Sequence, residues 1–277
     1  MAPENKKVDL KKELTIFVTV RNRQWTVQRV ANYYRCEHKA NVVIIDSSES
    51  PVKEMDNPEI LGKNVKYLHL PGKHYVEKLH DCLEQIDTKY SIVVCDDDFL
   101  CPTGLETAVN FLEENPDVVS VRGQNAGIWD SEAFVHKRGV IAYDVVEYML
   151  EYLHPTPNDL TDLERTQRAW VFFDGSNVHS LMRTQTHIEI QKWHLNNHNL
   201  NAMSFYDKTF TFLLASYGKM MVLPVFWILR SQEVGAKSLI TQKNAANDIK
   251  NWNPELKFSS DFLKFDTSPL EKVVGVD

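Results

Sequence analysis

The sequence has few of the residues that mark unusual protein classes. Its 277 residues include only 10 glycines, 11 prolines and 4 cysteines, which excludes a collagen-like repeat, low-complexity disorder and a small disulfide-rich scaffold. The most lipid-like stretch, residues 220–229, is too short to span a bilayer and contains Pro224. With 43% hydrophobic residues, a chain of this length can bury a large core. We therefore expect one large α/β domain or two small ones.

Charge and cysteine spacing exclude further classes. The net charge is -7 and the basic residues are scattered among acidic ones, which argues against nucleic-acid binding because phosphate contacts need clustered Lys and Arg. The four cysteines form no C-x-x-C pair, so a zinc knuckle or a redox motif has little support. Residues 1–7 are polar, unlike a signal peptide. We expect a cytoplasmic protein, in the host cytoplasm if the source is a virus, and leave peripheral membrane contact and oligomeric state open.

Strands and helices alternate in the first half of the sequence. Four β-branched and aromatic runs predict strands that are buried on both faces: residues 14–20, 41–46, 65–70 and 90–95. Helices are expected between them, the first capped by Asn22, and another from Pro102 to a stop before Pro116. A further strand is expected at residues 118–121. This order predicts an α/β fold with a mainly parallel sheet flanked by helices.

The second half is less regular. Helices are expected at residues 143–153 and about 205–217, the second ended by Gly218 in the left-handed conformation. Residues 196–201 are rich in asparagine and are expected to form a loop. Three short strands are expected: residues 170–173, 178–182 and 220–225. We see no repeat and no linker, and expect a single domain with a C-terminal segment from about residue 232.

Three consecutive acids, Asp96, Asp97 and Asp98, follow the strand at residues 90–95. Ligands in open parallel sheets bind beyond the carboxyl ends of the strands, and adjacent carboxylates held there need a counter-charge. A divalent cation supplies one, and oxygen ligands suit Mg²⁺ or Mn²⁺ bound together with substrate phosphates. Because side chains alternate along an extended chain, Asp96 and Asp98 should share a face. The alternative is a solvated acidic loop that caps the helix beginning at Pro102.

The order of these features resembles the GT-A nucleotide-sugar glycosyltransferases, in particular the family-2-like and exostosin-like members. The similarity covers about residues 14–230 and rests on the strand ending in residues 19–23, the strand ending at Asp46 and the acidic triplet. It implies a Rossmann-like nucleotide-sugar-binding half and an acceptor-binding half, followed by an extension that packs on the body. The corresponding boundaries are about 14–122, 123–231 and 232–277. It also implies transfer of a hexose or pentose from a nucleotide donor, UDP-linked, to a carbohydrate hydroxyl in glycan synthesis.

The same resemblance implies roles for the acidic triplet. Asp98 would bind the Mn²⁺ or Mg²⁺ ion that bridges the two phosphates of the donor. Asp96 would assist the metal, and Asp96 or Asp97 would hold the ribose. The triplet directly after a buried strand is the most specific motif in the sequence.

Four further residues match the nucleotide pocket of that family. Val20 and Arg21 would line it, Asp46 would recognise the nucleobase, and Lys78 would face the diphosphate. Each has a plainer interpretation: Arg21 as a solvated residue in a loop before a helix, Asp46 as the end of a strand, and Lys78 as an exposed helix residue. The usual Arg/Asn-rich form of the segment around Lys78 is absent.

An inverting sugar transfer needs a carboxylate that removes a proton from the acceptor hydroxyl. The family places this acid near the start of a helix in the second half, and Asp207 matches in position and pattern. An acid in the first turn of a helix is also favoured by the helix dipole alone. Asp174 is the second candidate, as a base or as a ligand for acceptor hydroxyls, and its alternative is an ordinary turn residue.

Several other side chains have weaker indications of a binding role. His194 and His198 are four residues apart and could bind zinc on one helix face, although the surrounding asparagines favour a loop. Arg230 could contact the diphosphate or could be a surface residue at a strand end. Three tryptophans could stack on sugar rings, although large aromatics usually belong to the core: Trp129, Trp170 and Trp193.

Two alternative functions stay open on sequence grounds. A sugar-phosphate nucleotidyltransferase is also α/β and metal-dependent, but such enzymes usually open with a glycine-rich phosphate loop, which residues 18–23 do not provide. A non-catalytic carbohydrate-binding protein could keep the same fold without turnover.

Overall fold

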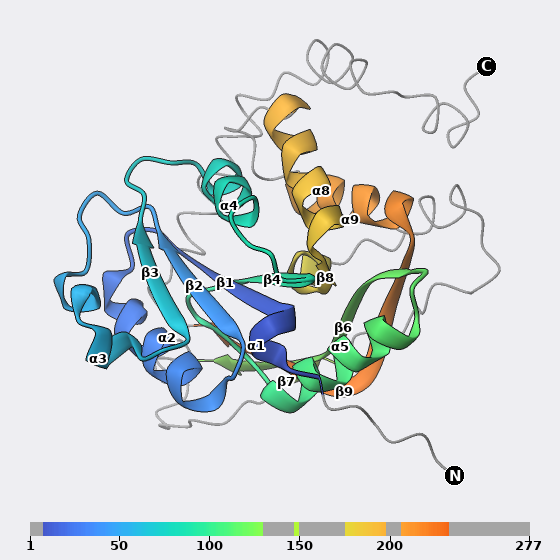
Figure 1. Ribbon diagram of the computed structural model, residues 1–277, viewed down its shortest axis with the longest axis horizontal. Helices are drawn as coiled ribbons and strands as arrows, with labels where there is room; N and C mark the ends of the chain where they lie inside the picture. Colours follow the sequence, from blue (N-terminus) through green and yellow to red (C-terminus); the bar gives the residue numbers. More distant parts are fainter. Residues whose placement is uncertain (1–7, 130–146, 150–174, 198–205, 233–277) are drawn as a thin grey trace, which may run out of the picture.

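The computed structural model describes residues 8–129, 147–149, 175–197 and 206–232, and all structural statements concern these residues. Within them the chain forms one curled, mixed β-sheet with helices on both faces (Figure 1). This confirms the expected α/β class. The expected strand at 170–173 and the segment from residue 233 onward lie outside the described residues.

In the first half, strands and helices alternate as the sequence predicts. The elements are α1 (Leu10–Glu13), β1 (Leu14–Val20), α2 (Gln24–Glu37), β2 (Asn41–Asp46), the 3₁₀ turn η1 (Lys53–Asp56), α3 (Pro58–Leu61), β3 (Val65–His69), α4 (Tyr75–Leu83), β4 (Tyr90–Cys95), β5 (Asp98–Leu100) and α5 (Pro102–Glu114).

The described parts of the second half supply longer strands and two helices. The elements are β6 (Val118–Trp129), β7 (Glu147–Met149), the 3₁₀ turn η2 (Gly175–His179), β8 (Leu181–Arg183), α8 (Thr184–Asn197), α9 (Tyr206–Tyr217) and β9 (Lys219–Gln232).

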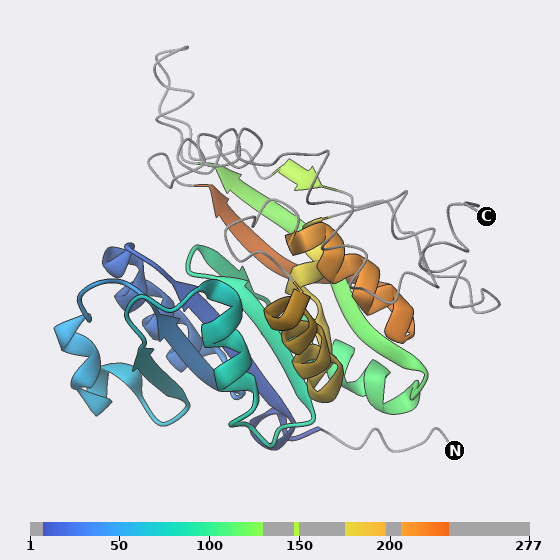
Figure 2. The same cartoon turned by 90° about the horizontal axis from the view of Figure 1, so that it is seen from above.

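The sheet order is β3-β2-β1-β4-β8-β6-β9-β5, with β7 paired to β6. The first four strands are parallel, and their register places Val20 opposite Asp46 and Thr19 opposite Cys95. The carboxyl ends of β1, β2 and β4 therefore meet at one edge of the sheet. The second half adds antiparallel pairs as well as a long parallel pair, β6 with β9, which lie side by side in Figure 2.

Side-chain alternation divides the core between the two faces of the sheet. Ile16 and Val18 of β1 belong to a cluster with residues of α2 and α5, whereas Phe17 packs with α4 on the other face. Helices α8 and α9 extend that second layer beside α4. Strands that are covered on both faces explain why the sequence shows continuous apolar runs.

Three secondary-structure predictions for the second half are wrong in part. Residues 147–149, expected in a helix, form a strand that pairs with β6. Residues 196–197, expected in a loop, end helix α8. In addition, residues 178–179 belong to η2 and the strand begins only at Leu181. A three-residue strand and a helix with a weak apolar pattern carry too little periodic signal to be recognised.

Two predicted helix ends also differ. Asn22 has a φ of 55° and lies before the N-cap Arg23, so Asn22 does not cap α2. Gly218 does not adopt a positive φ. Glycine is required at this position because a Cβ atom would lie 2.7 Å from Cγ1 of Val119, too close for van der Waals contact.

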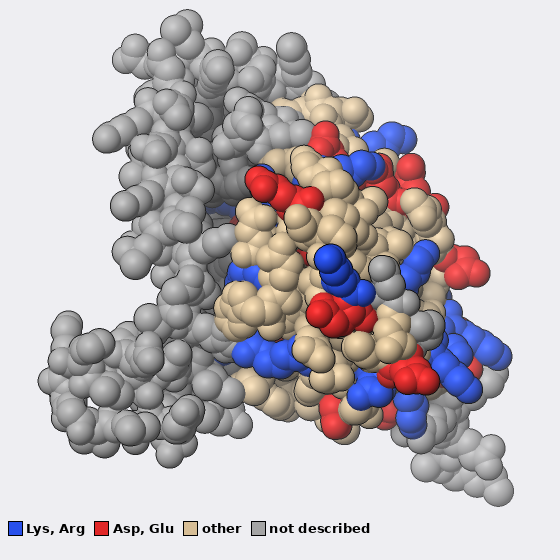
Figure 3. Space-filling model, turned by 90° about the vertical axis from the view of Figure 1, so that its left-hand side faces the viewer, with Lys and Arg blue, Asp and Glu red and all other residues tan. Residues whose placement is uncertain are grey.

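The described surface carries mixed charge. On the side of α3 and β3, basic and acidic side chains are interspersed (Figure 3). Within the described ranges, no helix has both the length and the apolar character required to cross a lipid bilayer.

His187 makes part of the folding free energy dependent on pH. It lies fully buried in α8, with Nδ1 3.0 Å from the hydroxyl of Ser91 in β4, and burial lowers its pKa from 6.5 to about 3. Between these values the unfolded chain binds a proton that the folded chain does not. Stability from this group is therefore complete above pH 6.5 and falls as the pH drops, by up to about 1.4 kcal/mol per unit.

The variant His187→Asn keeps a polar side chain near Ser91 but cannot titrate. We expect its unfolding free energy, measured by urea denaturation from pH 7 to pH 4.5, to fall less steeply than that of the wild type. The difference in unfolding free energy at pH 7, where His187 is neutral in the folded chain, gives the packing cost of the substitution. Parallel curves for the two proteins would show that His187 does not couple folding to pH.

Candidate active site

The acidic triplet lies at the carboxyl edge of the sheet, but it is not an extended run. Asp96 and Asp97 form a turn after β4, and Asp98 begins β5. The side chains of Asp96 and Asp98 are almost fully buried, at 3% and 2% exposure. Burial raises the pKa of Asp96 to about 6 and that of Asp98 to about 7. Because the turn breaks the alternation, these two side chains contact different groups instead of sharing a face.

Arg23 neutralises the first two acids. Its guanidinium donates to Asp97 Oδ2 at 2.8 Å and lies 3.3 Å from Asp96 Oδ1. The hydroxyl of Thr26 donates to Asp96 Oδ2 at 2.6 Å. Arg23 is therefore held against the triplet, and the protein itself supplies part of the counter-charge that a metal ion was expected to supply.

Asp98 faces the second half of the chain. Strand register pairs it with Arg230 of β9, whose Nε lies 3.6 Å from Asp98 Oδ1. Arg230 is thus a residue within a strand beside the acidic cluster. The other carboxylate oxygen, Oδ2, is buried and accepts no hydrogen bond from any described residue. Nε2 of His179 lies 3.9 Å from this oxygen.

His179 is a site residue that the sequence analysis missed. It ends η2 and lies buried, with Nδ1 2.9 Å from the carbonyl oxygen of Val93 and its own carbonyl accepting from Trp227 Nε1 at 3.0 Å. A carbonyl only accepts, so Nδ1 carries the hydrogen and Nε2 presents its lone pair toward Asp98. Burial lowers the pKa of His179 to about 4, which keeps the ring neutral. A single histidine outside any motif gave no sequence signal for this position.

Three side chains at this place are candidate ligands for a metal ion. The ligand atoms of Cys95, Asp98 and His179 lie within 4.8 Å of one another, and the buried oxygen of Asp98 lacks a donor. Together they offer sulfur, oxygen and nitrogen to an ion.

Lys78 is neither exposed nor directed at open solvent. It is 2% exposed, and its ammonium group donates to the carbonyl oxygens of Val20 at 2.8 Å and Ile45 at 3.1 Å, and to Ser47 Oγ at 3.1 Å. All three of its protons are used. Burial lowers its pKa to about 8, an effect that the nearby Asp46 opposes. Lys78 therefore ties the ends of β1 and β2 together.

Asp46 is equally well anchored. It is fully buried at the end of β2. Its Oδ1 accepts from the backbone N–H and the hydroxyl of Ser48, and its Oδ2 accepts from the Tyr67 hydroxyl at 2.7 Å. Val20, opposite Asp46 in the sheet, is buried, whereas the side chain of Arg21 is exposed. The structure thus brings Val20, Arg21 and Asp46 together at the strand ends.

Asp207 lies at the start of α9, in the first turn, with its side chain exposed. Desolvation raises its pKa, and electrostatic interactions with His179 and with the positively charged Arg230 oppose the shift. Both of these residues also lie beside Asp98. Asp207 and Asp98 therefore share two neighbours, although 109 positions separate them in the sequence.

The remaining candidates lie elsewhere or outside the described residues. His194 is buried in α8, with Nδ1 2.8 Å from the carbonyl of Ile190 and Nε2 2.9 Å from Thr209 Oγ1. Both ring nitrogens are engaged, so His194 is a core residue and the zinc hypothesis is not supported. Trp193 packs against the same core cluster. Asp174, Trp170 and His198 lie outside the described residues, and so does the side chain of Trp129.

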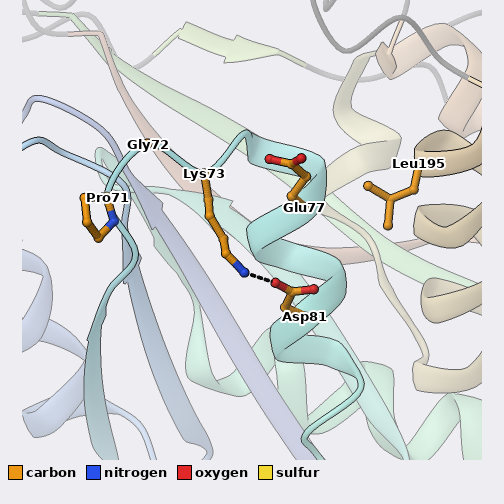
Figure 4. A pocket seen from close by; sticks show the side chains of 6 residues that line it. All are labelled: Pro71, Gly72, Lys73, Glu77, Asp81 and Leu195. Atoms are coloured by element: carbon orange, nitrogen blue, oxygen red, sulfur yellow. Dashed lines mark hydrogen bonds and ion pairs between the residues drawn. The ribbon is translucent and has the colours of Figure 1, made fainter.

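A groove of about 500 Å³ runs beside α4. Figure 4 shows the residues that line it: Pro71, Gly72, Lys73, Glu77, Asp81 and Leu195. Lys73 and Asp81 form an ion pair in it. None of the candidate acids lines this groove. The segment from Gly72 to Asp81 thus presents several side chains to the groove, while Lys78 turns toward the strand ends.

Comparison with known proteins identifies a similar fold. No protein-family model and no curated protein matches the sequence. Among solved structures, S. aureus TarS 1-349 is similar, with 16% identity and a TM-score of 0.51 over 92% of this chain and 73% of that one. The same protein in complex with UDP-GlcNAc gives 16% identity and a TM-score of 0.51, over 96% and 76% of the two chains. The complex with UDP gives 14% and 0.50, over 92% and 73%. TarS is a glycosyltransferase, and the likeness shows that this chain has a GT-A-like fold.

Arg23 provides a test of the buried charge balance. Removing one partner of a buried ion pair leaves an uncompensated charge, so we expect Arg23→Met to lower the unfolding free energy at pH 7 by about 2–4 kcal/mol. The matched control is Lys73→Met, because Lys73 pairs with Asp81 at the surface and exposed pairs contribute about 0–1 kcal/mol. Urea denaturation of both variants measures the difference. Equal losses would show that Arg23 does not neutralise the triplet.

Proposed function

We propose that this chain is a metal-dependent glycosyltransferase that moves a sugar from a UDP-linked donor to a carbohydrate hydroxyl. The observation that carries the proposal is the buried Asp98 at the carboxyl edge of a GT-A-like sheet, with one carboxylate oxygen lacking a donor among the described residues. Ligands of open α/β sheets bind at this edge. The crystal structures of TarS with UDP and with UDP-GlcNAc support a UDP-sugar donor.

The nucleotide would lie over the ends of β1 and β2. Val20 and Asp46 are paired there in the sheet, and Lys78 donates hydrogen bonds to the carbonyl oxygens of Val20 and Ile45 at the two strand ends. The exposed guanidinium of Arg21 can approach an anionic diphosphate from the same edge. Asp97, which accepts a hydrogen bond from Arg23, would accept hydrogen bonds from the ribose. In this arrangement the chain supplies shape and hydrogen bonds for the base and ribose.

Asp98 would hold the divalent cation, with Asp96 supporting it from the preceding turn. When bound, such a cation neutralises the developing charge of the diphosphate leaving group. Arg230, beside Asp98, contributes a second positive charge at the same place. The leaving group is then stabilised by a cation and a guanidinium, which compensates for the acidic character of the site.

Asp207 would act as the base. In an inverting transfer, the acceptor oxygen attacks the anomeric carbon, the bond from that carbon to the diphosphate oxygen breaks, and the hydroxyl proton passes to the carboxylate. The pKa of Asp207 is raised by desolvation, which makes its carboxylate a better proton acceptor than a fully solvated one. The second half of the chain, from about residue 123 to 231, would contribute the acceptor side of the cleft, with Asp174 as a further candidate there.

Two alternatives predict different outcomes with the same nucleotide sugars. A sugar-phosphate nucleotidyltransferase would convert a nucleotide sugar and pyrophosphate into a nucleoside triphosphate and a sugar 1-phosphate, and a carbohydrate-binding protein would give no turnover. Incubation of a panel of nucleotide sugars with Mn²⁺, with and without added pyrophosphate, separates them. UDP release supports our proposal, triphosphate formed only with pyrophosphate supports the first alternative, and no turnover in either case supports the second.

We expect Asp98→Ala to abolish metal-dependent binding of UDP, because the variant loses the carboxylate proposed to hold the cation. Isothermal titration with UDP in the presence and absence of Mn²⁺ measures this. The control variant is Asp81→Ala, which removes an acid from the groove beside α4 and should bind UDP as the wild type does. Unchanged Mn²⁺-dependent affinity in Asp98→Ala would place the metal elsewhere.

We expect Asp207→Asn to leave UDP affinity intact and to slow sugar transfer by about 10²–10⁴-fold, since the amide cannot accept the proton. The single-turnover rate of sugar transfer, measured with an acceptor that the wild type glycosylates, gives the effect. NMR of the anomeric proton in the product tests inversion. Asp117→Asn, at the surface ion pair with Lys219, is the matched control. Transfer at a near-normal rate would remove Asp207 as the base.

A further inference from the structure

Polar contacts join the first turn of helix α9 to helix α8. Tyr206 is 2% exposed, and its hydroxyl oxygen accepts a hydrogen bond from Nε2 of Gln191, 2.6 Å away. The hydroxyl oxygen of Thr209 lies 2.9 Å from Nε2 of His194 and 3.0 Å from the carbonyl oxygen of Tyr206. Residues three apart lie on the same face of a helix, so Gln191 and His194 share one face of α8, as Tyr206 and Thr209 share one face of α9. Two side-chain contacts therefore fix how these faces meet.

Aromatic rings surround the same tyrosine. The ring of Tyr206 meets that of Tyr75, the first residue of α4, edge to face with the centroids 5.2 Å apart. Its centroid lies 4.6 Å from that of His194 in α8 and 5.7 Å from that of Phe210 in α9. All four side chains belong to or pack against one buried cluster or its polar surroundings. A ring packed among three helices has little freedom to move.

Asp207 directly follows Tyr206, so the contacts of Tyr206 determine where Asp207 lies. Successive residues are about 100° apart around a helix axis, and accordingly Tyr206 is buried while Asp207 is exposed. A rotation or shift of α9 would move the Asp207 carboxylate relative to His179 and Arg230, the groups with which it interacts electrostatically. The direction of this carboxylate is thus set by a contact on a neighbouring part of the helix surface.

We propose that Tyr206, held by Gln191, is a positioning residue for Asp207, and that its hydroxyl fixes the direction from which the carboxylate meets the acceptor hydroxyl. The inference rests on the proposed function, in which Asp207 is the base. Ring packing alone tolerates sliding, whereas a hydrogen bond restricts both distance and angle. Misplacing a reacting group by about 1 Å can slow a reaction by about 10²-fold, so this bond can affect the rate without any contact to substrate.

The variant Tyr206→Phe removes the hydroxyl and keeps the ring. We expect it to slow single-turnover sugar transfer by about 10–10²-fold and to leave the UDP affinity, measured by isothermal titration, unchanged. Gln191→Met removes the donor, keeps the ring contacts and should have the same effect. The matched control is Tyr217→Phe, which removes a hydroxyl from a 45% exposed tyrosine at the other end of α9 and should transfer sugar at the wild-type rate.

A double-mutant cycle separates positioning of Asp207 from a general effect on the fold. In the Asp207→Asn background no base remains to be positioned, so Tyr206→Phe should have little further effect on the residual rate. Equal slowing of transfer in both backgrounds would overturn the inference. Circular dichroism of each variant shows whether it is folded, and Gln191→Met decides if Tyr206→Phe is misfolded.

The pKa of Asp207 gives a measurement that does not depend on activity. Desolvation raises this pKa, and loosening the first turn of α9 would admit water. We therefore expect the pKa, measured by NMR titration of the carboxyl carbon, to fall toward its ordinary value in Tyr206→Phe and to stay unchanged in Tyr217→Phe. An unchanged pKa in Tyr206→Phe would overturn the inference. A lowered pKa in a protein that transfers no sugar would support the positioning contact and overturn the proposed function.

Discussion

Burial of carboxylates at the carboxyl edge of a parallel sheet is the constraint on which the rest of the site depends. Asp46, Asp96 and Asp98 are each at most 3% exposed, and taking an ionised carboxylate out of water is costly unless charges or hydrogen bonds compensate. Asp46 is compensated by hydrogen bonds, and Asp96 by Thr26 and Arg23. In the described part of the chain, the Arg230 guanidinium lies 3.6 Å from one oxygen of Asp98, and the other oxygen accepts no hydrogen bond. The incomplete compensation at Asp98 is what distinguishes a candidate ligand from a structural acid.

Lys78 of helix α4 fixes the ends of β1 and β2 by hydrogen bonds. Lys78 donates hydrogen bonds to the carbonyl oxygen of Val20, the last residue of β1, and to that of Ile45, the residue before the end of β2. Helix α4 therefore fixes the positions of both strand ends. A buried ammonium with three acceptors defines a geometry, because each acceptor must stay within hydrogen-bond distance. A lysine expected to meet the ligand thus has a positioning contact instead, and Arg21 and Arg230 are the cations closer to open space.

Much of this fold could be predicted from the sequence, because strands buried on both faces give continuous apolar runs. The predicted strands at 14–20, 41–46 and 90–95 match β1, β2 and β4, and their parallel order puts the acids at one edge. Helix α8 was missed because several of its buried residues are polar, His187, Gln191 and His194 among them, and apolar periodicity does not register them. The partners of the triplet were missed for another reason. Arg23 lies about 74 positions from Asp97 in the sequence, and only the folded sheet brings them together.

The same long-range pairing bears on how the two halves of the chain work. Asp98 comes from the first half, whereas Arg230 and His179 come from the second, and antiparallel pairing of β5 with β9 sets the distance between them. The cluster around Asp98 therefore exists only when both halves share one sheet. Under the proposed function, the donor site would be coupled to the acceptor side by the same strands, because Asp207 and Asp98 both interact electrostatically with Arg230 and His179. Binding a cation at Asp98 would alter the electrostatic field at Asp207, which places leaving-group stabilisation and proton removal under one local charge balance.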